Sequence, residues 1–177
     1  VIVPADAAEA ADWVPIVAEF EGPVYLRISR AGALPIHQPG SALQIGKGRI
    51  LTEGNDAAII SMGSMTGRSA RAVEQLRTVG INARLVEMHT LKPIDRELIL
   101  ECAEKTGAIV TAEEHSIIGG LGSAVAEVLA EGCPVPMQRV GIHDAFCPTG
   151  RNLDTLMDAC GLSVAEIVDA VKGVLKR

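Results

Sequence analysis

The feature that most constrains this chain is an alternation of short aliphatic runs with longer amphipathic stretches, which begins near residue 49. Aliphatic runs of this length predict buried strands, and apolar residues spaced at i, i+3 and i+4 predict helices. Strands that alternate with helices over short connections form a parallel sheet, because right-handed crossovers place the helices on both faces. The sequence therefore predicts an α/β fold, with a three-layer domain and a mostly parallel sheet at residues 49–177.

The elements of this domain can be assigned from periodicity and from turn and cap residues. Strands are expected at 49–51, 57–62, 83–88, 108–112 and 137–142, and the first two are expected to pair as a hairpin across the turn at 53–56. Helices are expected at 66–79, from the cap residue Asp95 to Gly107, around 124–129, and at 163–175. The last helix carries the clearest apolar stripe.

Residues 1–38 are expected to form a short βαβ remnant of a second α/β domain. Its strands are predicted at 1–3 and 24–28, and its helix at 7–20, with Ala11, Val14 and Val17 on the apolar side and Pro15 as a kink or break. Such a unit is too small to fold alone. Because the chain starts inside an apparent buried strand, we expect further chain upstream of Val1. Residues 39–48, which contain Gly and Pro without a sustained period, are expected to be a linker.

Charge and composition exclude several classes of function. The formal net charge is −6 and no Lys/Arg cluster occurs, which argues against nucleic-acid binding. No apolar stretch is long enough for a membrane span, and the N-terminus does not resemble a signal peptide. The four cysteines form no C-x-x-C pair, so buried free thiols in a reducing compartment, the cytoplasm, are favoured over disulfides.

A glycine loop, Gly119-Gly120-Leu121-Gly122-Ser123, follows a predicted strand and opens a helix. Backbone N–H groups in such a loop can bind a phosphate at the helix N-terminus. Asp144 would then stand near the position of a ribose-binding acid, but Val125 occupies the third glycine position of the motif and the loop is long. A structural turn is therefore favoured over dinucleotide binding.

A group of acidic and histidine residues follows two of the predicted strands. Glu113, Glu114, His115, His143 and Asp144 could be a metal site, but adjacent strand residues point to opposite faces and no recognised ligand spacing occurs. A hydrogen-bonded loop cluster is the favoured interpretation.

Arg27 and Arg30 alternate with apolar residues at the end of a predicted strand. An arginine in this position can bind an anion with its bidentate guanidinium, although spacing alone favours a surface salt bridge.

The residues themselves resemble the transketolase family over essentially the whole chain. The N-terminal part, from Val3-Pro4-Ala5-Asp6 to Pro35, is similar to the end of the pyrimidine-binding domain, and the remainder is similar to the transketolase C-terminal domain, especially of enzymes split over two polypeptides. The motifs that carry the resemblance are Gly22-Pro23-Val24-Tyr25-Leu26-Arg27-Ile28-Ser29-Arg30, Glu53-Gly54, Met88-His89-Thr90-Leu91-Lys92-Pro93-Ile94-Asp95, Glu113-Glu114-His115-Ser116-Ile117-Ile118-Gly119-Gly120-Leu121-Gly122 and Val140-Gly141-Ile142.

This resemblance implies an activity that the chain does not contain in full. Transketolases move a two-carbon ketol unit between sugar phosphates, as in the pentose phosphate pathway, through thiamine diphosphate held with a divalent metal such as Mg²⁺. The domains that bind most of this cofactor are missing, so the partners implied are N-terminal transketolase domains or a subunit that carries them, in a homodimer. Arg30 occupies the position of the substrate-phosphate arginine, whereas Arg27 is expected to be structural. No catalytic residue, cofactor ligand or metal ligand is assigned here, and the isolated chain is expected to be inactive. The stretch after Phe146 departs from the family's usual pattern.

Two alternatives stay open. One lies in the same superfamily and comprises 1-deoxyxylulose-5-phosphate synthase and the β chain of a 2-oxo acid dehydrogenase; Arg30 with Pro35 favours transketolase over both. The other is a non-catalytic α/β module that binds a nucleotide or a protein, to which the glycine loop would contribute.

Overall fold

The computed structural model describes residues 1–30 and 32–176, which contain a five-stranded sheet in the order β1-β3-β2-β4-β5. Ala31 in the predicted N-terminal unit and Arg177 at the end of the predicted domain lie outside these residues. Strands β2 to β5 run parallel, and β1 pairs antiparallel with β3 at the edge. The strands are β1 (Arg49–Thr52), β2 (Ala57–Ser61), β3 (Ala83–Glu87), β4 (Ile109–Ser116) and β5 (Met137–Ile142).

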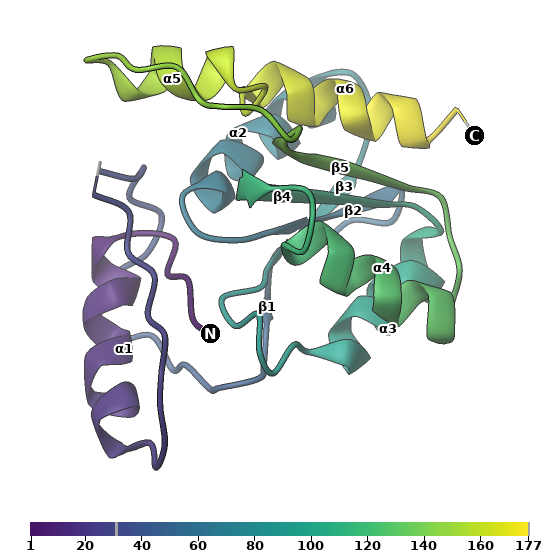
Figure 1. The fold of residues 1–177 in the computed structure, drawn as a ribbon. Helices are drawn as coiled ribbons and strands as arrows, with labels where there is room; N and C mark the ends of the chain where they lie inside the picture. The colour runs from purple at the N-terminus through teal and green to yellow at the C-terminus, as the bar shows by residue number, and fades with distance from the viewer. Residues whose placement is uncertain (31, 177) are drawn as a thin grey trace.

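Helices cover both faces of this sheet (Figure 1). One face carries α2 (Met65–Thr78), α5 (Leu153–Ala159) and α6 (Val164–Val174), and the other carries α3 (Arg96–Thr106) and α4 (Leu121–Glu131). The central strand β2 is buried along its whole length, so Ala57 and Ile59 pack into one apolar core while Ala58 and Ile60 pack into the other. The predicted three-layer α/β fold is confirmed.

The predicted hairpin between the first two strands is wrong. Strand β1 pairs with β3, through Arg49 opposite Glu87 and Ile50 opposite Val86, and β2 lies on the other side of β3. The physical reason is the apolar character of β2: a strand buried on both faces is most stable in the middle of a parallel sheet, where both of its edges are paired. The short helix α5 was not predicted either.

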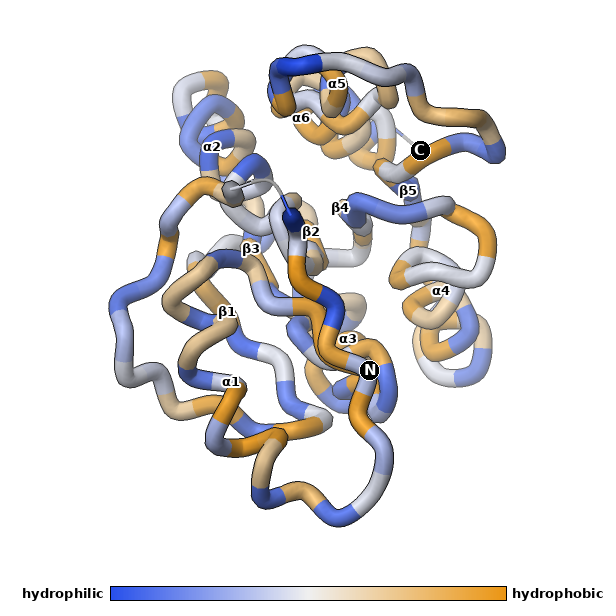
Figure 2. The backbone as a smooth tube through the Cα atoms, turned by 60° about the vertical axis from the view of Figure 1, so that its left-hand side comes forward, coloured by the Kyte–Doolittle hydropathy of each residue, from blue (hydrophilic) through white to orange (hydrophobic). Residues whose placement is uncertain are grey.

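The N-terminal segment lies beside the sheet and contains the helix α1 (Ala7–Glu19). In place of the two predicted strands, the structure has a single parallel bridge between Ile2 and Leu26. Figure 2 shows the N-terminus beside the extended segment that includes Leu26, in which hydrophobic and hydrophilic residues alternate. Tyr25 and Ile28 are each 62% exposed, so this segment has no second strand beside it among the described residues.

Helix α1 begins after Asp6, whose side chain accepts a hydrogen bond of 3.0 Å from the N–H group of Glu9, and it continues through Pro15. The predicted apolar side of this helix is wrong. Val14 is 59% exposed, whereas Glu9 and Trp13 are both completely buried. The buried face of α1 thus combines one apolar side chain, Trp13, with one charged side chain, Glu9.

Other expectations can be settled briefly. All four cysteines are free, but only Cys102 is buried, so the thiols are less enclosed than predicted. None of the helices within the described residues has the length and apolar character of a membrane span.

Candidate functional site

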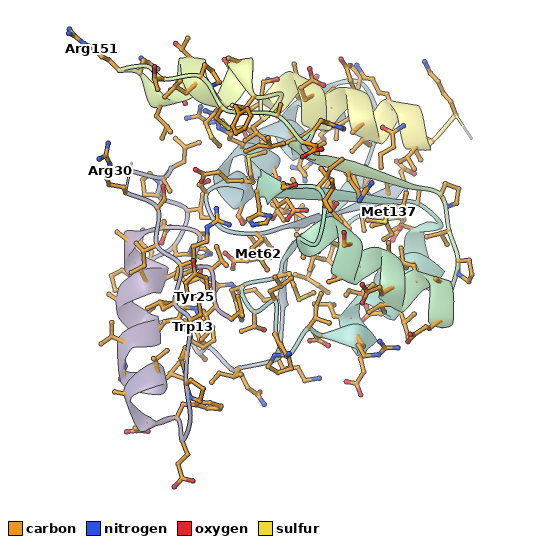
Figure 3. The ribbon with its side chains drawn as sticks, viewed as in Figure 1. Trp13, Tyr25, Arg30, Met62, Met137 and Arg151 are labelled. Carbon is orange, nitrogen blue, oxygen red and sulfur yellow. The ribbon has the colours of Figure 1, made fainter. Side chains whose placement is uncertain are left out.

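Arg30 lies at the end of the extended segment, next to the first turn of α1 (Figure 3). Its guanidinium is exposed and has no ion-pair partner within residues 1–30 and 32–176. The arginine borders a cavity of about 130 Å³, whose lining comprises Pro4, Ala5, Asp6, Ala7, Ala10, Ile28, Ser29, Arg30, Gly32 and Ala33. Because the N-terminus of a helix carries partial positive charge, this cavity offers two attractions for an anion.

One carboxylate, that of Asp6, also borders this cavity and must be explained. Its oxygens accept hydrogen bonds from the backbone N–H groups of Glu9, Ile36 and His37, at 3.0, 2.8 and 2.9 Å. Burial alone would raise the pKa of Asp6, but these donors outweigh it and hold the pKa below its usual value. The negative charge of Asp6 is thus compensated by backbone donors within the protein.

A larger cavity of about 340 Å³ opens at the carboxyl ends of β2 and β4, where ligands collect in parallel sheets. Arg27 borders it and donates a short hydrogen bond from its guanidinium to the backbone oxygen of Glu114. Arg27 is therefore engaged in joining the N-terminal segment to β4. The lining residues, of which Figure 3 labels Tyr25 and Met62, are Val1, Val3, Tyr25, Arg27, Met62, Leu91, Glu113, Glu114, His115, Gly119 and Gly120.

The glycine loop does not present a free anion site. The carboxylate of Glu113, buried to 3% exposure, accepts hydrogen bonds from the N–H groups of Leu121 at 2.6 Å and Gly122 at 2.8 Å. Burial raises the pKa of Glu113, and the two donors partly oppose that rise. A Cβ atom on Gly120 would lie 2.0 Å from Glu113 Oε2. The glycines thus admit the protein's own carboxylate, in the place that a nucleotide phosphate would need.

The five residues considered as a metal site are not brought together. Glu113 caps α4, Glu114 accepts a short hydrogen bond from the Ser64 hydroxyl, and His115, His143 and Asp144 are exposed. The favoured interpretation, one hydrogen-bonded loop cluster of these residues, stays a prediction.

A buried cluster of charged groups that the sequence did not reveal lies between α1 and the sheet. It joins His89 to Glu9 (Nδ1 to Oε1, 3.2 Å), His37 to Glu87 (Nε2 to Oε2, 3.3 Å) and Arg49 to Glu87 (Nε to Oε2, 2.5 Å). The side chains of Glu9 and Glu87 are completely buried, and the Trp13 ring stands edge-on to His89 with 5.1 Å between ring centroids.

The electrostatics of this cluster favour charged imidazoles. Burial opposes a charge on His89, but the nearby carboxylates of Glu87 and Glu9, whose oxygens lie 3.9 and 3.2 Å from Nδ1, prevail and raise the pKa of His89 to about 9. The same balance, with Glu87 as the partner, raises the pKa of His37. Burial alone would raise the pKa of Glu87, but the two imidazoles and the Arg49 guanidinium hold it well below its usual value.

Three members of this cluster, Glu9, Glu87 and His89, offer ligand atoms within 4.8 Å of one another, and no other such group occurs in the described part of the chain. A metal ion does not fit them, because the Arg49 guanidinium already bonds Glu87 at 2.5 Å and would be repelled by a cation. Mg²⁺ also prefers an octahedral set of oxygens with several waters, which this dry cluster cannot supply.

Comparisons with known proteins agree with one another. The family described as transketolase, C-terminal domain, matches residues 46–167. The chain is 43% identical, over 174 residues, to the 6-deoxy-6-sulfo-D-fructose transketolase subunit SqwH of Clostridium sp. (strain MSTE9), covering 98% of this chain and 54% of that protein. It is 38% identical, over 181 residues, to 1-deoxy-D-xylulose-5-phosphate synthase 1 of Geobacter sulfurreducens, covering 97% of this chain and 28% of the synthase.

A solved structure described as a split gene transketolase, inactive beta4 tetramer, superposes with a TM-score of 0.93. It is 47% identical to this chain and covers 99% of it, while the chain covers 57% of that protein. The chain spans about half the length of the transketolase subunits that it matches.

Proposed function

Because the chain belongs to the transketolase family, we propose that it is the C-terminal part of a thiamine-diphosphate-dependent transketolase. The complete protein would transfer a two-carbon ketol unit between sugar phosphates. The other half, as further domains or as a second polypeptide, would bind thiamine diphosphate and Mg²⁺ and supply the reaction centre. Similarity to subunits of split enzymes supports this division of labour.

The division of the chain belongs to the same proposal. Residues 1–38 would complete a pyrimidine-binding domain, 39–48 would be a linker, and 49–177 would be the C-terminal domain. The extended segment at Tyr25 and Ile28, with its exposed side chains, would then receive a further strand from the missing part of that domain. We propose a homodimer of the complete enzyme, in the cytoplasm, where free thiols such as the exposed Cys147 persist.

The observation that carries the proposal is the free guanidinium of Arg30 beside the α1 N-terminus. A phosphate group of a sugar substrate would accept two parallel hydrogen bonds from this guanidinium and gain from the helix dipole. The role of Arg30 would be to bind and orient the substrate, so that its carbonyl end reaches the cofactor. Proton transfer and covalent chemistry would take place on the other half of the enzyme.

The test is reconstitution. The complete chain is combined with its N-terminal partner, thiamine diphosphate and Mg²⁺, and ketol transfer is measured with phosphorylated and unphosphorylated acceptor sugars. Loss of a charge-assisted bidentate contact should make Arg30→Ala raise the KM for the phosphorylated acceptor about 10- to 100-fold and leave the unphosphorylated acceptor unchanged. Arg71→Ala, at an exposed arginine on α2, is the control and should change neither KM. Equal KM ratios in all three proteins would remove Arg30 from the substrate site.

A second reaction is favoured by the similarity to 1-deoxy-D-xylulose-5-phosphate synthase. The same reconstituted protein can be offered pyruvate or a ketose phosphate as the donor. If only the ketose phosphate serves as donor, the result supports transketolase. If pyruvate serves as donor, the result supports the synthase.

A further inference from the structure

The buried charged residues between α1 and the sheet connect the chain near Arg30 to the sheet. We call this set the charge cluster; its members are Asp6, Glu9, His37, Arg49, Glu87 and His89. Asp6 Oδ2 accepts the N–H groups of Ile36 and His37 and lies 3.2 Å from His37 Nδ1. The other ring nitrogen of His37 lies 3.3 Å from Glu87 at the end of β3. One imidazole thus links the first turn of α1, the chain just after Arg30 and the sheet.

A second link runs beside the first. Arg49, on the edge strand β1, bonds Glu87 at 2.5 Å, and its Nη2 atom lies 3.6 Å from Glu9 Oε1 on α1. The backbone contributes as well, because the N–H group of Val3 donates to the His89 oxygen at 2.9 Å and that of Leu91 donates to the Val1 oxygen at 2.9 Å. These contacts fix α1 and its N-terminus over the end of β3.

When all three carboxylates of the cluster are ionised, its charges balance only if both imidazoles are charged. Three carboxylates face one guanidinium and two imidazoles, so the sum is zero when both imidazoles are charged. An unpaired carboxylate in such a buried place is strongly destabilising, because water cannot solvate it. The neutral form of either imidazole would leave a net negative charge between α1 and the sheet.

We propose that His37 and His89 are positioning residues, which hold the segment after Arg30 against α1 and so keep the Arg30 guanidinium over the substrate-phosphate cavity. The effect of this positioning on catalysis rests on the proposed function. The positioning of the segment itself is independent of that proposal. Arg30, Gly32 and Ala33 line the cavity together with Asp6, which also accepts the backbone N–H group of His37. Release of His37 would free the chain between Arg30 and His37 at one end.

The expected consequence is a selective loss of phosphate recognition. In the reconstituted enzyme, His37→Gln keeps the approximate size of the side chain and removes its charge. It should raise the KM for the phosphorylated acceptor about tenfold, because a misplaced guanidinium contributes little binding energy to the phosphate. The kcat and the KM of the unphosphorylated acceptor should stay unchanged. His143→Gln, at an exposed histidine outside the cluster, is the matched control and should change nothing.

A second readout does not depend on activity. Backbone hydrogen exchange of residues 32–38 in the complete protein, corrected for intrinsic rates, should accelerate in His37→Gln about tenfold, and not in His143→Gln. Unchanged exchange in this segment would overturn the inference, whatever the kinetics show.

These experiments distinguish an error in this inference from an error in the proposed function. If Arg30→Ala loses phosphate selectivity while His37→Gln alters neither selectivity nor exchange, Arg30 binds phosphate and the positioning role is wrong. If Arg30→Ala keeps its selectivity but His37→Gln accelerates exchange, the positioning role stands and the phosphate site is wrong.

The unmodified enzyme provides a test that needs no substitution. The groups that face the two imidazoles are Asp6, Glu9, Arg49 and Glu87. As the pH rises through about 9, His89 loses its proton and the network loses its balance. The ratio of the two KM values should then rise several-fold between pH 7 and pH 10, and a flat ratio would overturn the inference.

Discussion

Glu113 shows at the scale of one residue how a conspicuous motif can serve the fold alone. Both carboxylate oxygens accept N–H groups of α4, at 2.6 and 2.8 Å. In Glu113→Gln the amide nitrogen must face one of these donors, so we expect a loss of about 1–3 kcal/mol in the free energy of unfolding, measured by denaturant titration.

The control for this change is Glu114→Gln. Glu114 accepts from the Ser64 hydroxyl, which can rotate to suit an amide, so a cost below about 1 kcal/mol is expected. Equal costs for the two variants would contradict the capping role of Glu113.

The residues of the charge cluster could not be found from the sequence, for a physical reason. Glu9, His37 and His89 come from three separate parts of the chain and share no spacing that a motif search would detect. Two signals were available: Glu87 and His89 stand two residues apart at the end of a buried strand, and so share one face, and Glu9 and Trp13 share one face of α1. By contrast, Arg30 was predicted from family resemblance, and its role stays a prediction.

At the scale of elements, cap residues were the most reliable sequence signal, and Asp95 is the best example. Its side chain accepts the Leu98 N–H group at 3.2 Å, as predicted, and it also accepts the Gly48 N–H group at 3.1 Å. Asp95→Ala should therefore cost about 2 kcal/mol of unfolding free energy. Ser163 makes only the helix cap, to Glu166 at 3.1 Å, so Ser163→Ala should cost about 1 kcal/mol in the same denaturant titration. A larger loss in Ser163→Ala would show that the contact to Gly48 contributes nothing.

Periodicity predicted the long elements because one apolar stripe decides each of them. The last helix was expected at 163–175 and is observed at Val164–Val174, and the strand at 137–142 is observed at Met137–Ile142. Periodicity failed where contacts with other elements determine the structure. The pairing of β1 depends on which strand occupies the centre of the sheet, and the buried face of α1 depends on the charged groups that it contacts. The helix α5 has only seven residues, too few for a periodic signal.

At the scale of the whole molecule, the N-terminal segment and the sheet are joined by polar contacts as well as by apolar ones. Of the N-terminal residues, Val3 enters the core on the α3 and α4 side, while the charge cluster, the backbone bonds of Val1 and Val3, and the bond from Arg27 to Glu114 make the remaining junction. A junction of buried ion pairs is sensitive to protonation, whereas an apolar one is not. The stability of the molecule should accordingly depend on pH with a recognisable profile.

The direction of that profile follows from the two strongest shifts. His89 has its pKa raised from 6.5 to about 9 in the folded state, so its contribution is complete below pH 6.5 and is lost as the pH rises to about 9. Glu87 has its pKa lowered from 4.5, so its contribution is present above pH 4.5 and is lost in acid. We therefore expect maximal stability between about pH 4.5 and 6.5. Between pH 6.5 and 9 the free energy of unfolding should fall by at most about 1.4 kcal/mol per pH unit, which sets an upper bound of about 3.5 kcal/mol in total.

Denaturant titrations at a series of pH values check this expectation, and His89→Gln identifies its source. The variant should be less stable than the unmodified protein at pH 6.5 and should approach it by pH 9, because glutamine binds no proton in either state. His143→Gln should reproduce the unmodified profile, since this exposed imidazole lies outside the charge cluster. An alkaline slope that persists in both His89→Gln and His37→Gln would assign the loss of stability to a group outside the charge cluster.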